Sequence, residues 1–200
     1  MDNILGQYQP SAEEVEKYLH QWECMDNYVA QENALDKLFF ELCPKNEDMN
    51  DILLKCATLN DFYSTNILDV YSVARHILAV PNIDDRLKKG DKSLVKEIAR
   101  LTVGKDQSPR FFYSFASKYC SHHQPLLYAI YDNYVHKVLM ALKKRDAFAV
   151  FKNNDLKEYD IFIDIIKKFQ RFYKLDNYNL KQIDKYLWQL GREWYGKKKF

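Results

Sequence analysis

Long uncharged stretches and an apolar leader are missing from this 200-residue chain. No window of eighteen residues is free of Asp, Glu, Lys and Arg, whereas a transmembrane helix needs about 20 mainly apolar residues. The start, Met1-Asp-Asn-Ile-Leu-Gly6, has neither the basic residues nor the apolar run of a signal peptide. We therefore expect no contact with membranes and a cytoplasmic protein.

Paired cysteines are missing too. The cysteines are scattered without a Cys-x-x-Cys motif, so we expect cytosolic thiols rather than a zinc site or a disulfide framework: Cys24, Cys43, Cys56 and Cys120. Cys120, His122 and His123 stand close together, but three such near ligands need a special loop and a fourth ligand is not evident. The histidines fit the last turn of a helix, where imidazolium interacts well with the helix dipole. We expect no metal and no cofactor.

Strand-like alternation and internal repeats are also missing, and the predicted fold class is all-α. A capping box, Ser11-Ala-Glu-Glu14, starts the first predicted helix. Apolar spacing predicts further helices at 28–42, 48–60, 68–80, 92–101, 109–122, 132–144, 155–174 and 179–195. Suitable helix starts precede several of them: Asp48 or Asn50, Asp69, Asp91, Ser108 before Pro109, Asp155 and Asn179.

The charge is +2 in total but uneven along the chain. Residues 1–85 hold 5 Lys/Arg and 16 Asp/Glu, residues 86–145 hold 13 and 4, and residues 146–200 hold 12 and 8. The middle segment is therefore strongly basic, which predicts nucleic-acid binding. The alternative is two oppositely charged lobes that attract each other, or a solvated face.

Asp132 is the only carboxylate between Asp106 and Asp146, in a basic and aromatic region. A carboxylate in such surroundings is a candidate for chemistry. The alternative is an N-cap, because Asp before an amphipathic run starts many helices. Among the nearby rings, helical spacing predicts that Phe111 and Phe115 belong to the core. The tyrosines left over could line a base pocket or pack as core: Tyr113, Tyr131 and Tyr134.

Two segments resemble the helix-hairpin-helix DNA glycosylases, the superfamily of endonuclease III and the adenine glycosylase. The first, Tyr128-Ala-Ile-Tyr-Asp-Asn-Tyr-Val-His-Lys-Val-Leu139, is similar to the segment of the catalytic aspartate. The second, Asp51–Asn66 with Asp69–Leu78, is similar to an early helix, a loop near the extruded base and the next helix. The resemblance covers roughly residues 50 to 145.

The departures from this superfamily are informative. Of its Leu-Pro-Gly-Val-Gly hairpin, Leu101-Thr-Val-Gly-Lys-Asp-Gln-Ser-Pro109 keeps only Gly104. The lysine nucleophile of bifunctional members falls at Ser114, and no cysteine follows Cys120 to hold an iron-sulfur cluster. The resemblance therefore implies a monofunctional enzyme, which does not cut the DNA strand. If a lysine were to form a Schiff base with the sugar, Lys118 would be the nearest candidate.

The resemblance implies a compact two-lobe helical bundle. Residues 46–149 would form a central lobe, and residues 1–45 with 150–200 a second lobe built from both chain ends. It implies a monomeric DNA glycosylase that extrudes a damaged or modified base from double-stranded DNA and hydrolyses its bond to the sugar, with Asp132 as the catalytic carboxylate. The base-contacting set would be Tyr63, Asn66, Tyr113, Tyr131 and Tyr134. The DNA-contacting set would be Gly104, Lys105, Ser108, Arg110, Lys118 and Lys137.

Two other classes stay open. One is a non-catalytic nucleic-acid-binding module on the same fold. The other is a helical interaction domain whose acidic first third docks a partner protein. The sequence does not identify the base, and bases of modified phage DNA would suit a divergent aromatic pocket.

Overall fold

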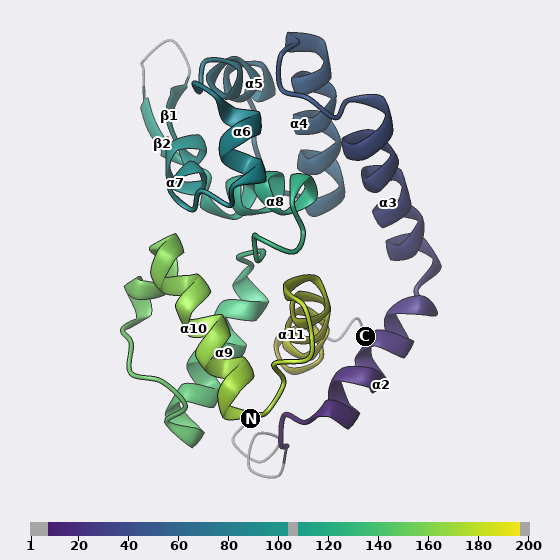
Figure 1. The fold of residues 1–200 in the computed structure, drawn as a ribbon, viewed down its shortest axis with the longest axis vertical. Coiled ribbons are helices and arrows are strands. Elements are labelled where there is room, and N and C mark those ends of the chain that lie inside the picture. The colour runs from purple at the N-terminus through teal and green to yellow at the C-terminus, as the bar shows by residue number, and fades with distance from the viewer. Residues whose placement is uncertain (1–7, 104–107, 197–200) are drawn as a thin grey trace. The chain divides into compact units, whose positions relative to one another are not determined.

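A computed structural model describes residues 8–103 and 108–196. The fold is mostly helical, with one two-stranded hairpin (Figure 1). The chain divides into two compact units. Asp26–Ile130 form the first, here called the central unit, and Met1–Met25 with Tyr131–Phe200 form the second, the chain-end unit. Both chain ends thus share one unit, but the boundaries lie at 25/26 and 130/131 rather than at 45/46 and 149/150.

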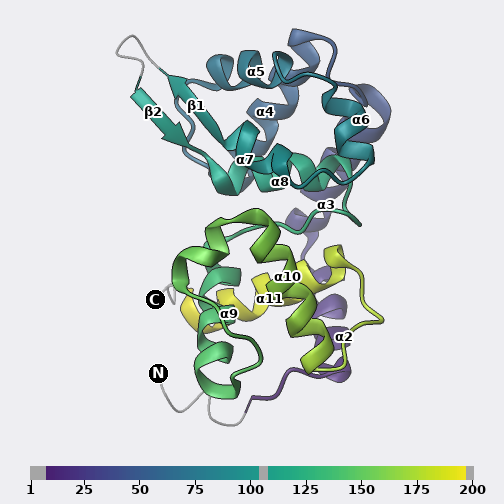
Figure 2. The ribbon, with the colours of Figure 1, turned by 60° about the vertical axis from the view of Figure 1, so that its left-hand side comes forward.

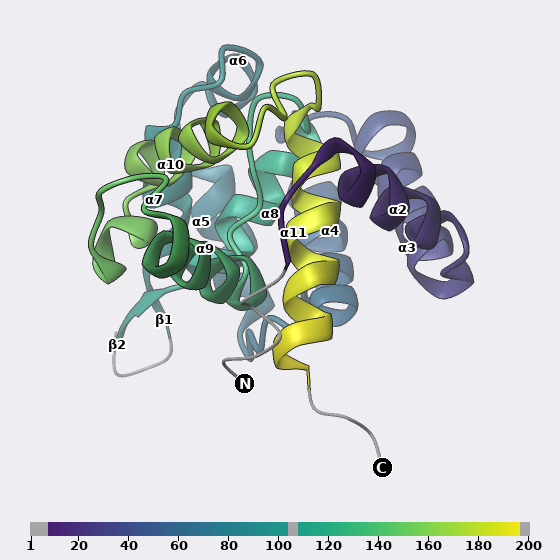
Figure 3. The same ribbon diagram turned by 90° about the horizontal axis from the view of Figure 1, so that it is seen from below.

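The chain-end unit is built around its last helix. Its elements are α2 (Ala12–Glu23), α9 (Asn133–Asp146), a 3-10 turn (Asn153–Lys157), α10 (Tyr159–Phe172) and α11 (Leu180–Tyr195). Helix α11 packs against both α2 and α9, and Figure 3 shows it with one of them on each side. Gly191 permits the close approach to α9, because a Cβ there would lie 2.6 Å from the Cβ of Tyr134. Gln189 Nε2 donates to the Tyr18 carbonyl at 2.8 Å, which ties α11 to α2.

The central unit surrounds a buried helix. Its elements are α3 (Asp26–Asp36), a π-helical segment (Lys37–Leu42), α4 (Met49–Tyr63), α5 (Val70–Leu78), α6 (Ile83–Lys88), α7 (Ser93–Ala99), β1 (Arg100–Val103), β2 (Ser108–Phe111) and α8 (Tyr113–His123). Every side chain of α8 from Phe115 to His123 is buried. Helices α4 and α7 pack against α8, so polar residues of α8 need partners inside the unit.

Local capping signals identify many of the helix starts. The side chains of Ser11, Asp48, Asp69 and Asn179 each accept a backbone N–H in the first turn of the helix that follows. These predicted starts are confirmed. Asp155 instead begins no long helix, because it lies within the 3-10 turn and α10 starts at Tyr159.

The expectation that Arg100, Leu101 and residues 109–111 are helical is wrong. They form an antiparallel hairpin in which Arg100 faces Phe111 and Leu101 faces Arg110 (Figure 2). Ser108-Pro109 therefore begins a strand, and α8 starts later, at Tyr113. Leu101-Thr-Val followed by Gly is typical of a strand that leads into a turn. The prediction of a helix over 92–101 did not take this pattern into account.

In the two described ranges, all helices are too short or too polar to cross a membrane.

Candidate functional site

Asp132 lies at the start of α9. Its backbone is extended and its Oδ1 accepts the Tyr134 N–H at 2.7 Å, so the N-cap interpretation is confirmed. The side chain is half-buried. Its catalytic role stays a prediction, but an N-cap bond does not use up a carboxylate, which can accept several hydrogen bonds.

The residues around Asp132 are held by ring and hydrogen-bond contacts inside the chain-end unit. Tyr131 OH bonds His136 Nδ1 at 3.0 Å, and His136 Nε2 bonds Asn153 Oδ1 at 2.8 Å. Burial, with a smaller contribution from the Asp132 charge, raises the pKa of Tyr131. The Tyr134 ring lies edge-on to Trp188, with centroids 6.4 Å apart. Tyr131 and Tyr134, two of the tyrosines that could line a base pocket, therefore have packing partners in this unit.

An open pocket of about 920 Å³ lies along α9. It is lined by His136, Lys137, Met140 and Tyr195 among others. Lys137, predicted to contact DNA, places its ammonium 5.6 Å from the centroid of the Tyr195 ring. A cation beside an open aromatic surface can bind a phosphate and keep its stem packed.

Tyr63 belongs to a polar group in the central unit. Tyr63 OH bonds His122 Nε2 at 2.9 Å, and the Lys118 ammonium lies 5.1 Å from the centroid of the Tyr63 ring. Lys118 also donates to Ser114 Oγ at 2.7 Å, one turn earlier on α8, and only 3% of Lys118 is exposed. This burial leaves Lys118 little exposed surface for the expected contact with DNA.

The loop after Tyr63 contains two residues with left-handed backbone. Ser64 has φ 48° and Asn66 has φ 58°, a conformation that costs about 1 kcal/mol for most residues and less for Asn. Asn60 holds this loop, because its Oδ1 accepts from the backbone N–H of Ile67 at 2.9 Å. Tyr63 and Asn66 are both exposed, so the loop can meet a ligand.

The hairpin residues have mixed outcomes. Gly104 and Lys105 lie outside the described residues, whereas Ser108 and Arg110 lie on β2 and Arg110 is exposed. Phe111, expected in the core, is 43% exposed, whereas Tyr113 is 5% exposed and agrees with its core alternative. A strand ends at Phe111, so the helical spacing that placed it in the core does not apply.

A buried lysine is the feature that sequence reasoning missed. Lys55 is fully buried and donates to the Lys45 carbonyl and to Asn46 Oδ1, each at 2.7 Å, with His123 Nε2 3.4 Å away. Tyr119 OH also donates to Asn46 Oδ1. We call these residues the Lys55 cluster. A cation inside the apolar run Leu53-Leu54-Lys55-Cys56-Ala57 was the available signal.

Burial controls the ionisation of this cluster. It lowers the pKa of Lys55 to about 8, although the Asp84 carboxylate acts in the opposite direction. It also lowers the pKa of His123 well below the usual range, with Lys55 as a further cause. Asp84 is bonded to Asn46 through both oxygens, at 2.6 and 3.0 Å. Every member thus has hydrogen-bond partners, as a stable buried network requires.

A pocket of about 670 Å³ adjoins the cluster and is lined partly by Asn46, Asp84 and His123. Within the described ranges, no group of three His, Cys, Asp or Glu side chains is arranged to hold a metal ion.

Residues 14–127 match the family HI_0787_N, described as an N-terminal domain. A Haemophilus influenzae protein named "Uncharacterized protein" is 48% identical over 175 residues, which are 88% of this chain and 79% of that protein. No solved structure matches the chain significantly. The matched range contains the Lys55 cluster, the Tyr63 group and the hairpin, and it ends before Asp132. Because this family match covers more than half of its residues, the chain belongs to the HI_0787_N family.

Proposed function

We propose that this protein is a monofunctional DNA glycosylase of the helix-hairpin-helix type that removes a damaged or modified base. The observation that carries the proposal is Asp132, a half-buried carboxylate held at the first residue before α9. Two further observations support it. Both chain ends form one unit and the middle of the chain the other, and the segment 86–145 is strongly basic.

The proposed reaction hydrolyses the bond between the base and C1′ of the sugar. The target nucleotide first leaves the stack, since the bond is inaccessible inside a duplex. The C1′–N electron pair departs with the base, which takes up a proton, and a water oxygen bonds C1′ and loses its proton. The Asp132 carboxylate stabilises the positive charge that grows on the sugar and accepts the proton of the water. The product is an abasic site.

Other residues have supporting roles in this proposal. Tyr63 and Asn66 offer an exposed ring and amide to the DNA from the central unit. Asn60 holds the loop after Tyr63, in which Ser64 and Asn66 have left-handed backbone. Arg110 and Lys137 supply cations for the DNA backbone, which dominates affinity in such complexes. A monomer acting on double-stranded DNA is sufficient for this chemistry.

The N-cap geometry provides a clean test. In Asp132→Asn, the amide oxygen can still accept the Tyr134 N–H, so the helix start is kept while the charge is lost. Wild type and variant are incubated with DNAs that carry damaged, mismatched or phage-modified bases, and strands are then treated with alkali. We expect alkali-dependent breaks that fall roughly 10²- to 10⁴-fold in the variant.

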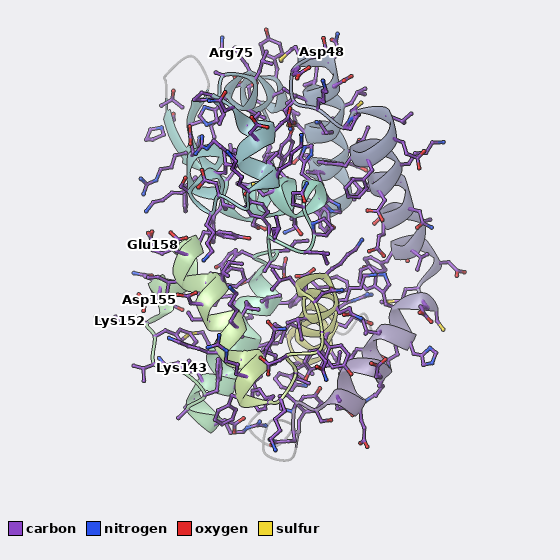
Figure 4. The ribbon with its side chains drawn as sticks, in the orientation of Figure 1. Asp48, Arg75, Lys143, Lys152, Asp155 and Glu158 are labelled. Carbon is purple, nitrogen blue, oxygen red and sulfur yellow. The ribbon has the colours of Figure 1, made fainter. Side chains whose placement is uncertain are left out.

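The matched control is Asp48→Asn, at the N-cap of α4, where Asp48 accepts from the Asn50 N–H at 2.8 Å (Figure 4). It changes the same group in the same structural role and should leave activity unchanged. If no substrate yields abasic sites, or if both variants lose activity equally, the proposal fails. Breaks without alkali would instead indicate a lysine nucleophile, with Lys118 the first candidate.

A non-catalytic nucleic-acid-binding module is the second candidate. It is favoured by the same hydrogen bond, because capping α9 is a sufficient structural role for Asp132. This alternative predicts salt-dependent DNA binding that is identical in wild type and Asp132→Asn, with no abasic sites formed.

A further inference from the structure

One face of the hairpin is exposed and combines an arginine with an aromatic ring. Residues directly opposite each other on paired strands point to the same face, so Arg100 shares its face with Phe111, and Thr102 with Pro109. Side chains two apart on one strand also share a face, which joins the two pairs. All four residues are exposed. We call this set the hairpin face.

Phe111 is held in a fixed stack. Its ring lies nearly parallel to that of Tyr113, with an angle of 11° and centroids 5.5 Å apart. Because Tyr113 is buried at the start of α8, it supports Phe111 from the unit's interior. The Arg100 guanidinium carbon lies 5.7 Å from the Phe111 centroid. Tyr113 therefore holds the ring in place from the interior, while 43% of Phe111 is exposed.

The hairpin also borders a shallow hollow of about 810 Å³, lined by residues of both strands and by His76 of α5. His76 is oriented by a 2.8 Å bond between its Nε2 and the Glu97 carbonyl oxygen. The Glu97 carboxylate is bound by Arg86 at 2.7 Å, and Arg86 also binds Asp91 at 2.8 Å. Glu97 and Asp91 are thus both paired within the unit. Arg100 and Arg110 are exposed, as is Arg75 on α5 (Figure 4).

We propose that the hairpin face binds an unpaired stretch of DNA, with one base stacked on Phe111 and a phosphate bound by Arg100. An arginine and a supported aromatic ring on an exposed face match the two parts of such a strand, its charged backbone and its flat bases. The base takes the place of the guanidinium over the ring, and the guanidinium turns to the phosphate. This binding goes beyond the proposed hydrolysis, since none of these residues takes part in the chemistry at Asp132.

The test compares two labelled single strands in a fluorescence anisotropy titration of the full-length protein. One is oligothymidylate, and the other has the same number of phosphates but carries abasic tetrahydrofuran units in place of nucleosides. Stacking requires bases and electrostatic attraction does not, so the wild type should bind oligothymidylate roughly 5- to 100-fold more tightly. This comparison needs no variant and is not affected by misfolding.

Variants then locate the preference. Phe111→Leu should abolish the preference for bases, whereas Phe172→Leu, which removes a ring of similar exposure (49%) from α10, should retain it. Arg100→Gln should weaken binding of both strands and reduce the slope of log affinity against log salt by about 0.7 in magnitude. Equal affinity of the wild type for the two strands overturns the proposal, as does equal loss in the two phenylalanine variants.

A duplex competitor provides the last arm. Blunt duplex DNA at the same nucleotide concentration should displace oligothymidylate less well than unlabelled oligothymidylate does, and stronger displacement by the duplex overturns the proposal. The glycosylase proposal is tested by a separate measurement, the formation of abasic sites, so the two proposals can fail independently.

Discussion

Replacing Lys55 by methionine should change how the free energy of unfolding depends on pH. Methionine keeps a long unbranched side chain but removes the ammonium, which is fully buried and bonded to the Lys45 carbonyl and Asn46. Near pH 7 the variant loses the hydrogen bonds to these two acceptors and no longer buries a charge. These effects oppose each other, so the informative quantity is the pH dependence.

The sign and size follow from the protonation of Lys55 in the two states. Burial lowers its pKa to about 8 in the folded chain, from 10.5 when exposed. Between these values the unfolded chain holds the proton more tightly, so the free energy of unfolding rises with pH. The whole interval corresponds to about 3 kcal/mol. The difference between wild type and Lys55→Met should therefore be constant below about pH 8 and grow by about 3 kcal/mol up to pH 10.5.

The assay is urea unfolding at several pH values from 7 to 10.5, followed by far-UV circular dichroism. Fluorescence alone would miss the effect, because the tryptophans all lie in the chain-end unit: Trp22, Trp188 and Trp194. Buried tyrosines such as Tyr119, whose pKa is raised by burial, lower stability at high pH in both proteins and cancel in the difference. Lys88→Met, which removes an exposed lysine of α6, should give a flat difference. A flat difference for Lys55→Met as well would refute the reasoning.

Three other predictions concern packing, thiol reactivity and capping. Gly191→Ala should lower the free energy of unfolding by roughly 1–3 kcal/mol in urea titrations, because the new Cβ would meet the Tyr134 backbone at 2.9 Å; an unchanged value would mean that α9 and α11 separate without cost. With Ellman's reagent on the native protein, Cys24 should react rapidly and the buried thiols slowly: Cys43, Cys56 and Cys120. Denatured protein, in which all four thiols react together, is the control, and more than one fast thiol would contradict the burial. Asp132→Ala should lower stability by about 0.5–2 kcal/mol and Asp132→Asn by almost nothing, as measured by thermal unfolding; equal losses would show that the N-cap bond is not what matters.

Signals that act within one turn of the chain were readable from the sequence. Ser11, Asp48, Asp69 and Asn179 cap helices because a short polar side chain reaches an N–H two or three residues later. The same logic gave the N-cap alternative for Asp132. The mostly helical class follows from such starts together with apolar spacing.

The hairpin and the Lys55 cluster were missed for different physical reasons. Leu101-Thr-Val is too short for its hydrophobic period to be distinguished from the end of a helix. Its strand structure depends on pairing with residues 108–110. In the Lys55 cluster Asn46 is bonded to Tyr119, 73 positions away, and Asp84 binds Asn46 from 38 positions away. No local spacing in the sequence encodes such contacts. The wrong expectation for Phe111 followed from the first of these errors, because a strand and not a helix ends at this residue.

The division of the chain has a consequence for its synthesis on the ribosome. The central unit is one continuous stretch, so it can fold as soon as residues 26–130 have emerged. Helix α2 is made earlier but must wait for α11, whose Glu193 carboxylate accepts a hydrogen bond from the Tyr18 hydroxyl at 2.6 Å. Until then Val15 and Tyr18, both buried in the finished protein, stay exposed on the nascent chain. Among the described elements of this unit, α2 is thus made first but packs only after α11, the last of them, has emerged.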